Sequence, residues 1–136
     1  MPYKVFVSHG SADLWLATQI GKEVVAVGGL PFLDETNIPK GHPNFKDVIR
    51  QEIAESRELI AIFTPWSALR SWVWIEIGAA WNRQIPVLAV LYGMSVDDFD
   101  KSGQGKAILE DANVIHLNEI DKYFRQLAGR TAVVSV

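Results

Sequence analysis

The sequence predicts an α/β domain in which a five-stranded parallel sheet lies between two layers of helices, as a three-layer sandwich. Two observations lead to this prediction. Short runs of β-branched and apolar residues alternate five times with longer segments whose apolar residues recur at helical spacing. No internal repeat or linker-like segment interrupts the alternation, so residues 1–136 are expected to form one domain.

The expected strands are apolar runs bounded by turn residues. Residues 58–64 (ELIAIFT) are nearly all apolar, which is typical of a central parallel strand covered on both faces. The other strands are expected over residues 3–8, 30–33, 85–92 and 112–117.

The helices are expected over residues 11–27, 45–56, 70–81 and 118–129, and the polar segment 93–105 allows a short one. Ser11 is the expected N-cap of the first helix, and Asn118 that of the last. Gly129 is expected to end the last helix.

Composition supports a folded domain and excludes several classes of function. The chain has 136 residues, of which 49% are hydrophobic and 21% charged, so it can bury a core. Its net charge of −3 argues against nucleic acid as a partner, because phosphate binding needs a basic face. The lack of cysteine excludes disulfides and thiolate metal sites. No apolar run approaches the ~20 residues that cross a bilayer, so a cytoplasmic protein without a membrane partner is expected.

Functional residues are expected at the carboxyl ends of the strands, because parallel sheets of this type bind ligands there. The segments in question are Ser8–Ser11, Asp34–Pro43, Thr64–Ser71 and Tyr92–Gly93.

The segment RSWVWIEIGAAW (70–81) combines three tryptophans with one acidic residue, Glu76. On a helix, Trp72 and Glu76 are four residues apart and share a face. A separate stripe of Trp74, Ile77 and Trp81 is expected to pack into the core. Glu76 is then either an ordinary solvated residue or a carboxylate partly desolvated beside an indole, and spacing alone does not decide between them.

Two loops at the strand ends each allow two interpretations. The turn SHGSAD either starts a helix or provides backbone N–H groups for an anion, although it lacks the G-x-G-x-x-G and phosphate-loop motifs. The loop DETNIPKGHP is either a connector or a lid over a binding site. The histidines His9, His42 and His116 lie on separate elements, so no metal site is expected, and His116 is expected to be partly buried in its strand.

The order of these segments resembles that of a Toll/interleukin-1 receptor (TIR) domain over residues 3–128. YKVFVSHGSAD resembles the first conserved box of that family. The segment from Phe32 to Trp81 resembles its second strand, BB loop, second helix, third strand and glutamate helix, and IPVLAVLY resembles its fourth strand. The resemblance implies a flavodoxin-like three-layer sandwich.

Many TIR domains from bacteria, plants and one animal branch split NAD+ between nicotinamide and ribose, and their W-x-x-x-E signature is WVWIE here. The resemblance is to the bacterial type. The resemblance therefore implies that Glu76 is catalytic, with NAD+ as substrate and no further cofactor. The residues that it implies for substrate binding are Ser8, His9, Gly10, Ser11, Phe32, Asp34, Pro43 and Trp72.

This chemistry suits a carboxylate. Cleavage of an N-glycosidic bond builds positive charge on the ribose, and an adjacent anion stabilises it. Glu76→Gln is expected to lower turnover by at least ~10².

The resemblance also implies self-association through the BB loop, Asp34–Pro43. The product could be cyclised into a signal in anti-phage defence that acts on a separate effector protein. Two other functions remain open: a non-catalytic TIR scaffold that acts by TIR–TIR assembly, and an enzyme similar to nucleoside deoxyribosyltransferases.

Overall fold

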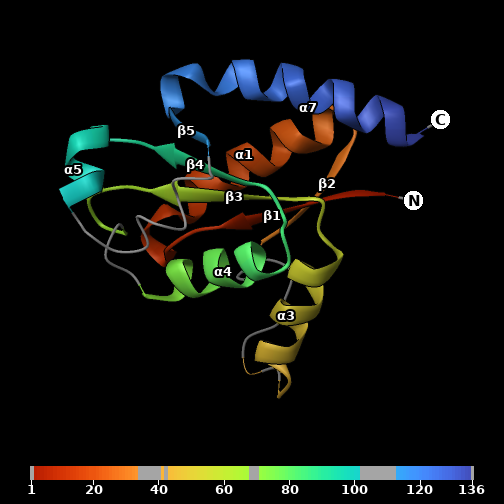
Figure 1. Cartoon of the computed structure of the whole chain (residues 1–136), viewed down its shortest axis with the longest axis horizontal. Helices are drawn as coiled ribbons and strands as arrows, with labels where there is room; N and C mark the ends of the chain where they lie inside the picture. The colour runs from red at the N-terminus through yellow and green to blue at the C-terminus, as the bar shows by residue number, and fades with distance from the viewer. Residues whose placement is uncertain (1, 34–40, 42, 68–70, 102–112, 136) are drawn as a thin grey trace.

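Five short apolar segments form one parallel sheet, as the sequence predicts, and the structure gives the strand order β2-β1-β3-β4-β5 (Figure 1). The computed structural model describes residues 2–33, 41, 43–67, 71–101 and 113–135. The strands are β1 (Tyr3–Ser8), β2 (Gly29–Phe32), β3 (Glu58–Phe63), β4 (Val87–Leu91) and β5 (Asn113–His116).

Helices cover both faces of the sheet, which confirms the predicted three-layer arrangement. They are α1 (Leu14–Ala26), α3 (Phe45–Glu55), α4 (Ser71–Asn82), α5 (Val96–Lys101) and α7 (Ile120–Ser135), with 3-10 turns η1 (Ser11–Asp13) and η2 (Leu117–Glu119). Figure 1 shows α1 and α7 on one face and α3 and α4 on the other.

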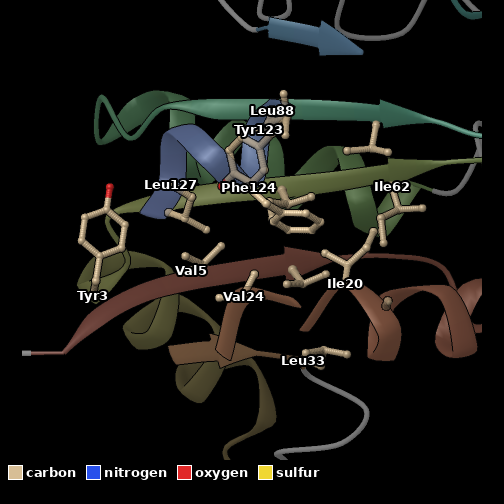
Figure 2. Close-up of a cluster of buried hydrophobic side chains, with 14 residues drawn as sticks. Tyr3, Val5, Ile20, Val24, Leu33, Ile62, Leu88, Tyr123, Phe124 and Leu127 are labelled. Atoms are coloured by element: carbon tan, nitrogen blue, oxygen red, sulfur yellow. The ribbon is translucent and has the colours of Figure 1, made fainter. Parts of the chain in front are cut away.

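Strand alternation divides the core into two halves. Successive side chains of a strand point to opposite faces, so Val5 and Val7 pack beneath α1 and α7 while Phe6 packs toward α3 and α4. Figure 2 shows the first half, in which Val24 of α1 and Leu127 of α7 meet the sheet.

All the strand pairs are parallel, so their carboxyl ends meet at one edge of the sheet, which we call the carboxyl edge. Ser8 ends β1 and pairs with Ala61, while Phe63 ends β3 and pairs with Leu91. The opposite edge, where Tyr3 and Glu58 begin their strands, is called the amino edge.

The start of the first helix differs from the prediction. Ser11 is not an N-cap: η1 begins there with Gly10 as its cap, and α1 follows from Leu14. Asp13 precedes α1, yet its carboxylate does not cap the helix, because it accepts a hydrogen bond from the Thr64 hydroxyl instead. A tertiary contact therefore replaces the local one.

The last helix also differs, since α7 starts at Ile120 and continues through Gly129 to Ser135. Asn118 lies within η2, before the first residue of α7, and is therefore not the N-cap of α7. His116, expected to be partly buried, is exposed at the end of the edge strand β5.

Candidate active site

Glu76 is buried in α4, one of the helices on the faces of the sheet, with 1% of its surface exposed. It belongs to the stripe of α4 that faces the sheet, together with Val73, Ile77 and Ala80, each of them fully buried. The interpretation of Glu76 as a solvated helix residue is therefore wrong.

The predicted tryptophan stripe is only partly correct. Trp74 packs against Phe63 and Phe99, with ring centroids 5.0 and 5.9 Å away. Trp81, by contrast, is 52% exposed. The helix turns its smaller residues toward the sheet, and Trp81 falls outside that stripe.

The Ser8 hydroxyl donates a hydrogen bond to Glu76 Oε1 across 2.6 Å, and both side chains are buried. Ser8 follows Phe6 by two residues, so it points to the same face of β1, toward α4. The distance is typical of a hydroxyl that donates to an ionised carboxylate. The end of the first strand and the middle of α4 are joined through this bond.

The residues after Ser8 form the turn into α1. His9 is buried, and its ring Nδ1 lies 2.9 Å from the Gly10 carbonyl oxygen. A carbonyl only accepts, so Nδ1 carries the proton. Gly10 is buried, whereas Ser11 is exposed.

The turn is braced against the end of β3 by a buried polar group that the sequence analysis missed. The Thr64 hydroxyl lies 3.0 Å from both carboxylate oxygens of Asp13. The Thr64 backbone N–H in turn donates to Ser67 Oγ over 3.0 Å. These bonds fix the first and third loops of the carboxyl edge relative to each other.

Aromatic residues line the same face of the sheet. Trp72 stacks on Phe45 at the start of α3, with ring centroids 6.1 Å apart, and Phe32 contacts Phe6 at 5.3 Å. Trp72 and Phe32 both pack against the core half that contains Ile77.

Two of the remaining predicted substrate-binding residues lie in the BB loop. Pro43 is exposed. Asp34 lies outside the described residues, as do residues 35–40 and His42.

A second buried carboxylate, Glu58, lies at the amino edge and was also missed. It accepts hydrogen bonds from the Tyr3 hydroxyl, from the Tyr123 hydroxyl at 2.7 Å, and from Arg130 Nε and Nη2 at 2.7 and 2.9 Å. Burial would raise the pKa of Glu58, but the hydrogen bonds from Arg130 and the two tyrosines outweigh it and lower that pKa. The pKa values of Tyr3 and Tyr123 are raised by burial and by the neighbouring carboxylate.

The Glu58 cluster borders a cavity of about 430 Å³ between the sheet and α7. Its lining includes Val114 of β5 and Lys122 of α7. This cavity lies at the amino edge, away from Glu76.

Among the residues that the structure describes, no group of three potential ligand side chains could hold a metal ion. None of the described helices has the length and hydropathy needed to cross a membrane.

A profile of the TIR domain family matches residues 5–128. Among solved structures, the chain is similar to a metazoan TIR-STING receptor from C. gigas in complex with 2',3'-cGAMP, at 23% identity and a TM-score of 0.70 over 91% of this chain and 38% of that one. It is also similar to the TIR domains of the activated Roq1 resistosome, which recognises the pathogen effector XopQ, at 17% identity and a TM-score of 0.61 over 97% and 84% of the two chains.

A third similar structure is a 2-deoxyribosyltransferase from Bacillus psychrosaccharolyticus, at 11% identity and a TM-score of 0.64 over 82% and 84% of the two chains. At these identities the three structures support the fold alone. None of the curated proteins matches the chain.

Proposed function

The chain belongs to the TIR domain family, and from this premise we propose that it is an enzyme that cleaves NAD+ between nicotinamide and ribose. The observation that supports the proposal most is the position of Glu76. This residue completes a W-x-x-x-E motif with Trp72, and its carboxylate is buried at the carboxyl edge, where parallel sheets bind ligands.

The main requirement of this reaction is a negatively charged side chain placed next to the ribose. As the bond from C1′ of the ribose to the nicotinamide nitrogen breaks, its electron pair leaves with the ring, and positive charge develops on the sugar. Nicotinamide departs as a neutral molecule, so no strong general acid is needed. A carboxylate fixed in a surrounding of low polarity stabilises the ribose cation more strongly than water would.

Glu76 must become accessible before it can act. With 1% of its surface exposed, the carboxylate contacts a ribose only after the carboxyl edge rearranges locally. Self-association through the BB loop could supply that rearrangement, and the Roq1 resistosome is a case of TIR domains within an assembly. Within this proposal, water attacks C1′ of the ribose cation and gives ADP-ribose and a proton, or a nucleophile of the same molecule attacks C1′ and closes a ring. The product is then a signal in anti-phage defence that a separate effector reads.

The experiment is chromatography of the products after NAD+ is incubated with concentrated protein. Wild-type protein is expected to release nicotinamide, and Glu76→Gln to lower the rate by at least ~10². Glu58→Gln, assayed at a temperature where it is folded, serves as a matched control because its carboxylate lies at the amino edge. Equal rates for wild-type and Glu76→Gln protein would contradict the proposal.

Two other functions are tested beside this proposal. The fold is shared with a 2-deoxyribosyltransferase, whose substrates also contain a glycosidic bond. Incubation with deoxynucleosides and a free base tests this alternative, since base exchange without NAD+ cleavage would favour it. A pure scaffold would self-associate in the same assay and release no nicotinamide.

A further inference from the structure

The hydroxyl of Ser8 donates its hydrogen bond to Glu76. It lies at the last position of β1 with 1% of the residue exposed, and it donates to Glu76 Oε1 at 2.6 Å. A serine hydroxyl has one proton to donate, so the same proton cannot serve a substrate oxygen while this bond exists.

We propose that Ser8 is a positioning residue that acts through Glu76, in place of the direct substrate contact that the sequence suggests. The inference rests on the proposed function of Glu76. It deepens that proposal by naming the group that orients the catalytic carboxylate.

The geometry explains why such a group is needed. A glutamate side chain has three rotatable bonds, and the inner part of the Glu76 side chain packs with the core stripe of α4. A hydrogen bond to Oε1 restrains the plane of the carboxylate and with it the direction of Oε2. Ser8 is well suited to give this bond because β1 is a central strand, paired on both sides with β2 and β3. The donor is thus attached to a rigid part of the fold.

The charge of the pair favours the same role. Ser8 is neutral, so its bond stabilises the buried carboxylate without cancelling the negative charge. A lysine or arginine at this position would neutralise the anion that the ribose cation requires. Ser8 therefore holds the Glu76 carboxylate without adding an opposite charge of its own.

The first test compares steady-state NAD+ cleavage by Ser8→Ala, Ser8→Thr and Ser8→Cys with that of wild type. Ser8→Ala is expected to lower kcat by about 10- to 100-fold with little change in KM, because the carboxylate is misplaced whereas substrate contacts remain. Ser8→Thr retains a hydroxyl and is expected to keep most of the wild-type kcat. Ser8→Cys has a thiol, which is a weaker donor, and is expected to keep only part of it. A rise in KM at unchanged kcat would overturn the proposal in favour of direct substrate binding.

A double variant tests the dependence on Glu76. If Ser8 acts through Glu76, Ser8→Ala has no further effect on the rate once Glu76→Gln is present. Multiplicative losses in the double variant would show independent roles and overturn the proposal.

A spectroscopic readout separates this inference from the proposed function. In protein labelled with 13C at the glutamate carboxyl groups, the Glu76 signal is assigned by its absence in Glu76→Gln. Its chemical shift is expected to move in Ser8→Ala and to return toward the wild-type value in Ser8→Thr or Ser8→Cys.

Ser56→Ala is the matched control, since this buried hydroxyl donates to the Glu52 carbonyl oxygen at 2.7 Å, at the end of α3. It is expected to leave both the rate and the Glu76 signal unchanged. An unmoved Glu76 signal in Ser8→Ala overturns the inference. If the Glu76 signal moves in Ser8→Ala but the wild-type protein does not cleave NAD+, the contact between Ser8 and Glu76 is supported and only the proposed function is contradicted.

Discussion

Glu76 and Glu58 are both buried carboxylates, but they differ in their hydrogen-bond donors and in the edge of the sheet at which they lie. Glu58 receives a bidentate bond from a guanidinium and bonds from two phenols, so its charge is compensated within the fold. The bond from Ser8 to Glu76 comes from a neutral group. Glu76 lies at the edge where parallel sheets bind ligands, whereas Glu58 lies at the opposite edge, so Glu76 is the better candidate for catalysis.

Glu58 is predicted to contribute to stability. Glu58→Gln should lower the free energy of unfolding by about 1–3 kcal/mol at neutral pH, because Arg130 loses its ionic partner. The loss stays below that for a fully buried pair, since the Arg130 side chain is 41% exposed and solvent screens its charge. Urea unfolding provides the measurement. Asp47→Asn, which breaks an exposed pair with Arg50 on α3, is the control and should change little.

The effect of Glu58 should depend on pH. Folding lowers its pKa below the ordinary 4.5, so its stabilising contribution is complete above that value and is lost as the pH falls through the lower pKa of the folded state. The difference between wild type and Glu58→Gln is therefore expected to be smaller near about pH 3 than near about pH 7. A difference that grows on acidification would show that the carboxylate is not held in its ionised form.

At the scale of the element, α7 continues past Gly129 because tertiary bonds hold its last turns. Arg130 reaches Glu58, and the Thr131 hydroxyl lies 2.5 Å from the Val27 carbonyl oxygen, to which it donates, and 3.0 Å from that of Ala128. Gly129 therefore lies inside a helix, although glycine usually marks a helix end.

Gly129→Ala is predicted to stabilise the protein by about 0.5–1 kcal/mol, because alanine loses less backbone entropy in a helix and its Cβ would meet no atom within 4 Å. Gly28→Ala should destabilise the protein by about 1–2 kcal/mol, because Gly28 has a φ of +91°, which alanine rarely adopts. Thermal unfolding of both variants is the measurement. Destabilisation by Gly129→Ala would mean that the helix ends before this residue in solution.

The differences between prediction and structure have the same origin at this scale. Apolar runs such as 58–64 locate a strand because burial on both faces demands them. The predicted start of α1 and the predicted end of α7 were wrong. Asp13 and Arg130 form hydrogen bonds with residues distant in sequence, and local patterns do not report such bonds. Trp81 was assigned to the core because it shares a helical stripe with Trp74 and Ile77, although the sheet-facing stripe of α4 consists of smaller residues.

At the scale of the molecule, the parallel sheet brings distant segments to one edge. The sequence predicted the parallel sheet between two layers of helices, and it predicted that the strand ends meet at one edge, where a ligand site is expected. It also singled out Ser8 and Glu76, but the bond between them depends on the packing of α4 against β1, which no spacing reveals. The Glu58 cluster was missed for the same reason, since Tyr3, Glu58 and Arg130 are far apart in the chain.

The central claim is that the Glu76 carboxylate contacts the nicotinamide ribose at the carboxyl edge. The most direct test is a crystal structure of Glu76→Gln protein with NAD+, since the slow variant should retain its substrate. We predict the ribose within hydrogen-bond distance of residue 76, with Ser8 beneath it and not in contact with the dinucleotide. A dinucleotide bound elsewhere, for example in the cavity beside Glu58, would contradict the claim.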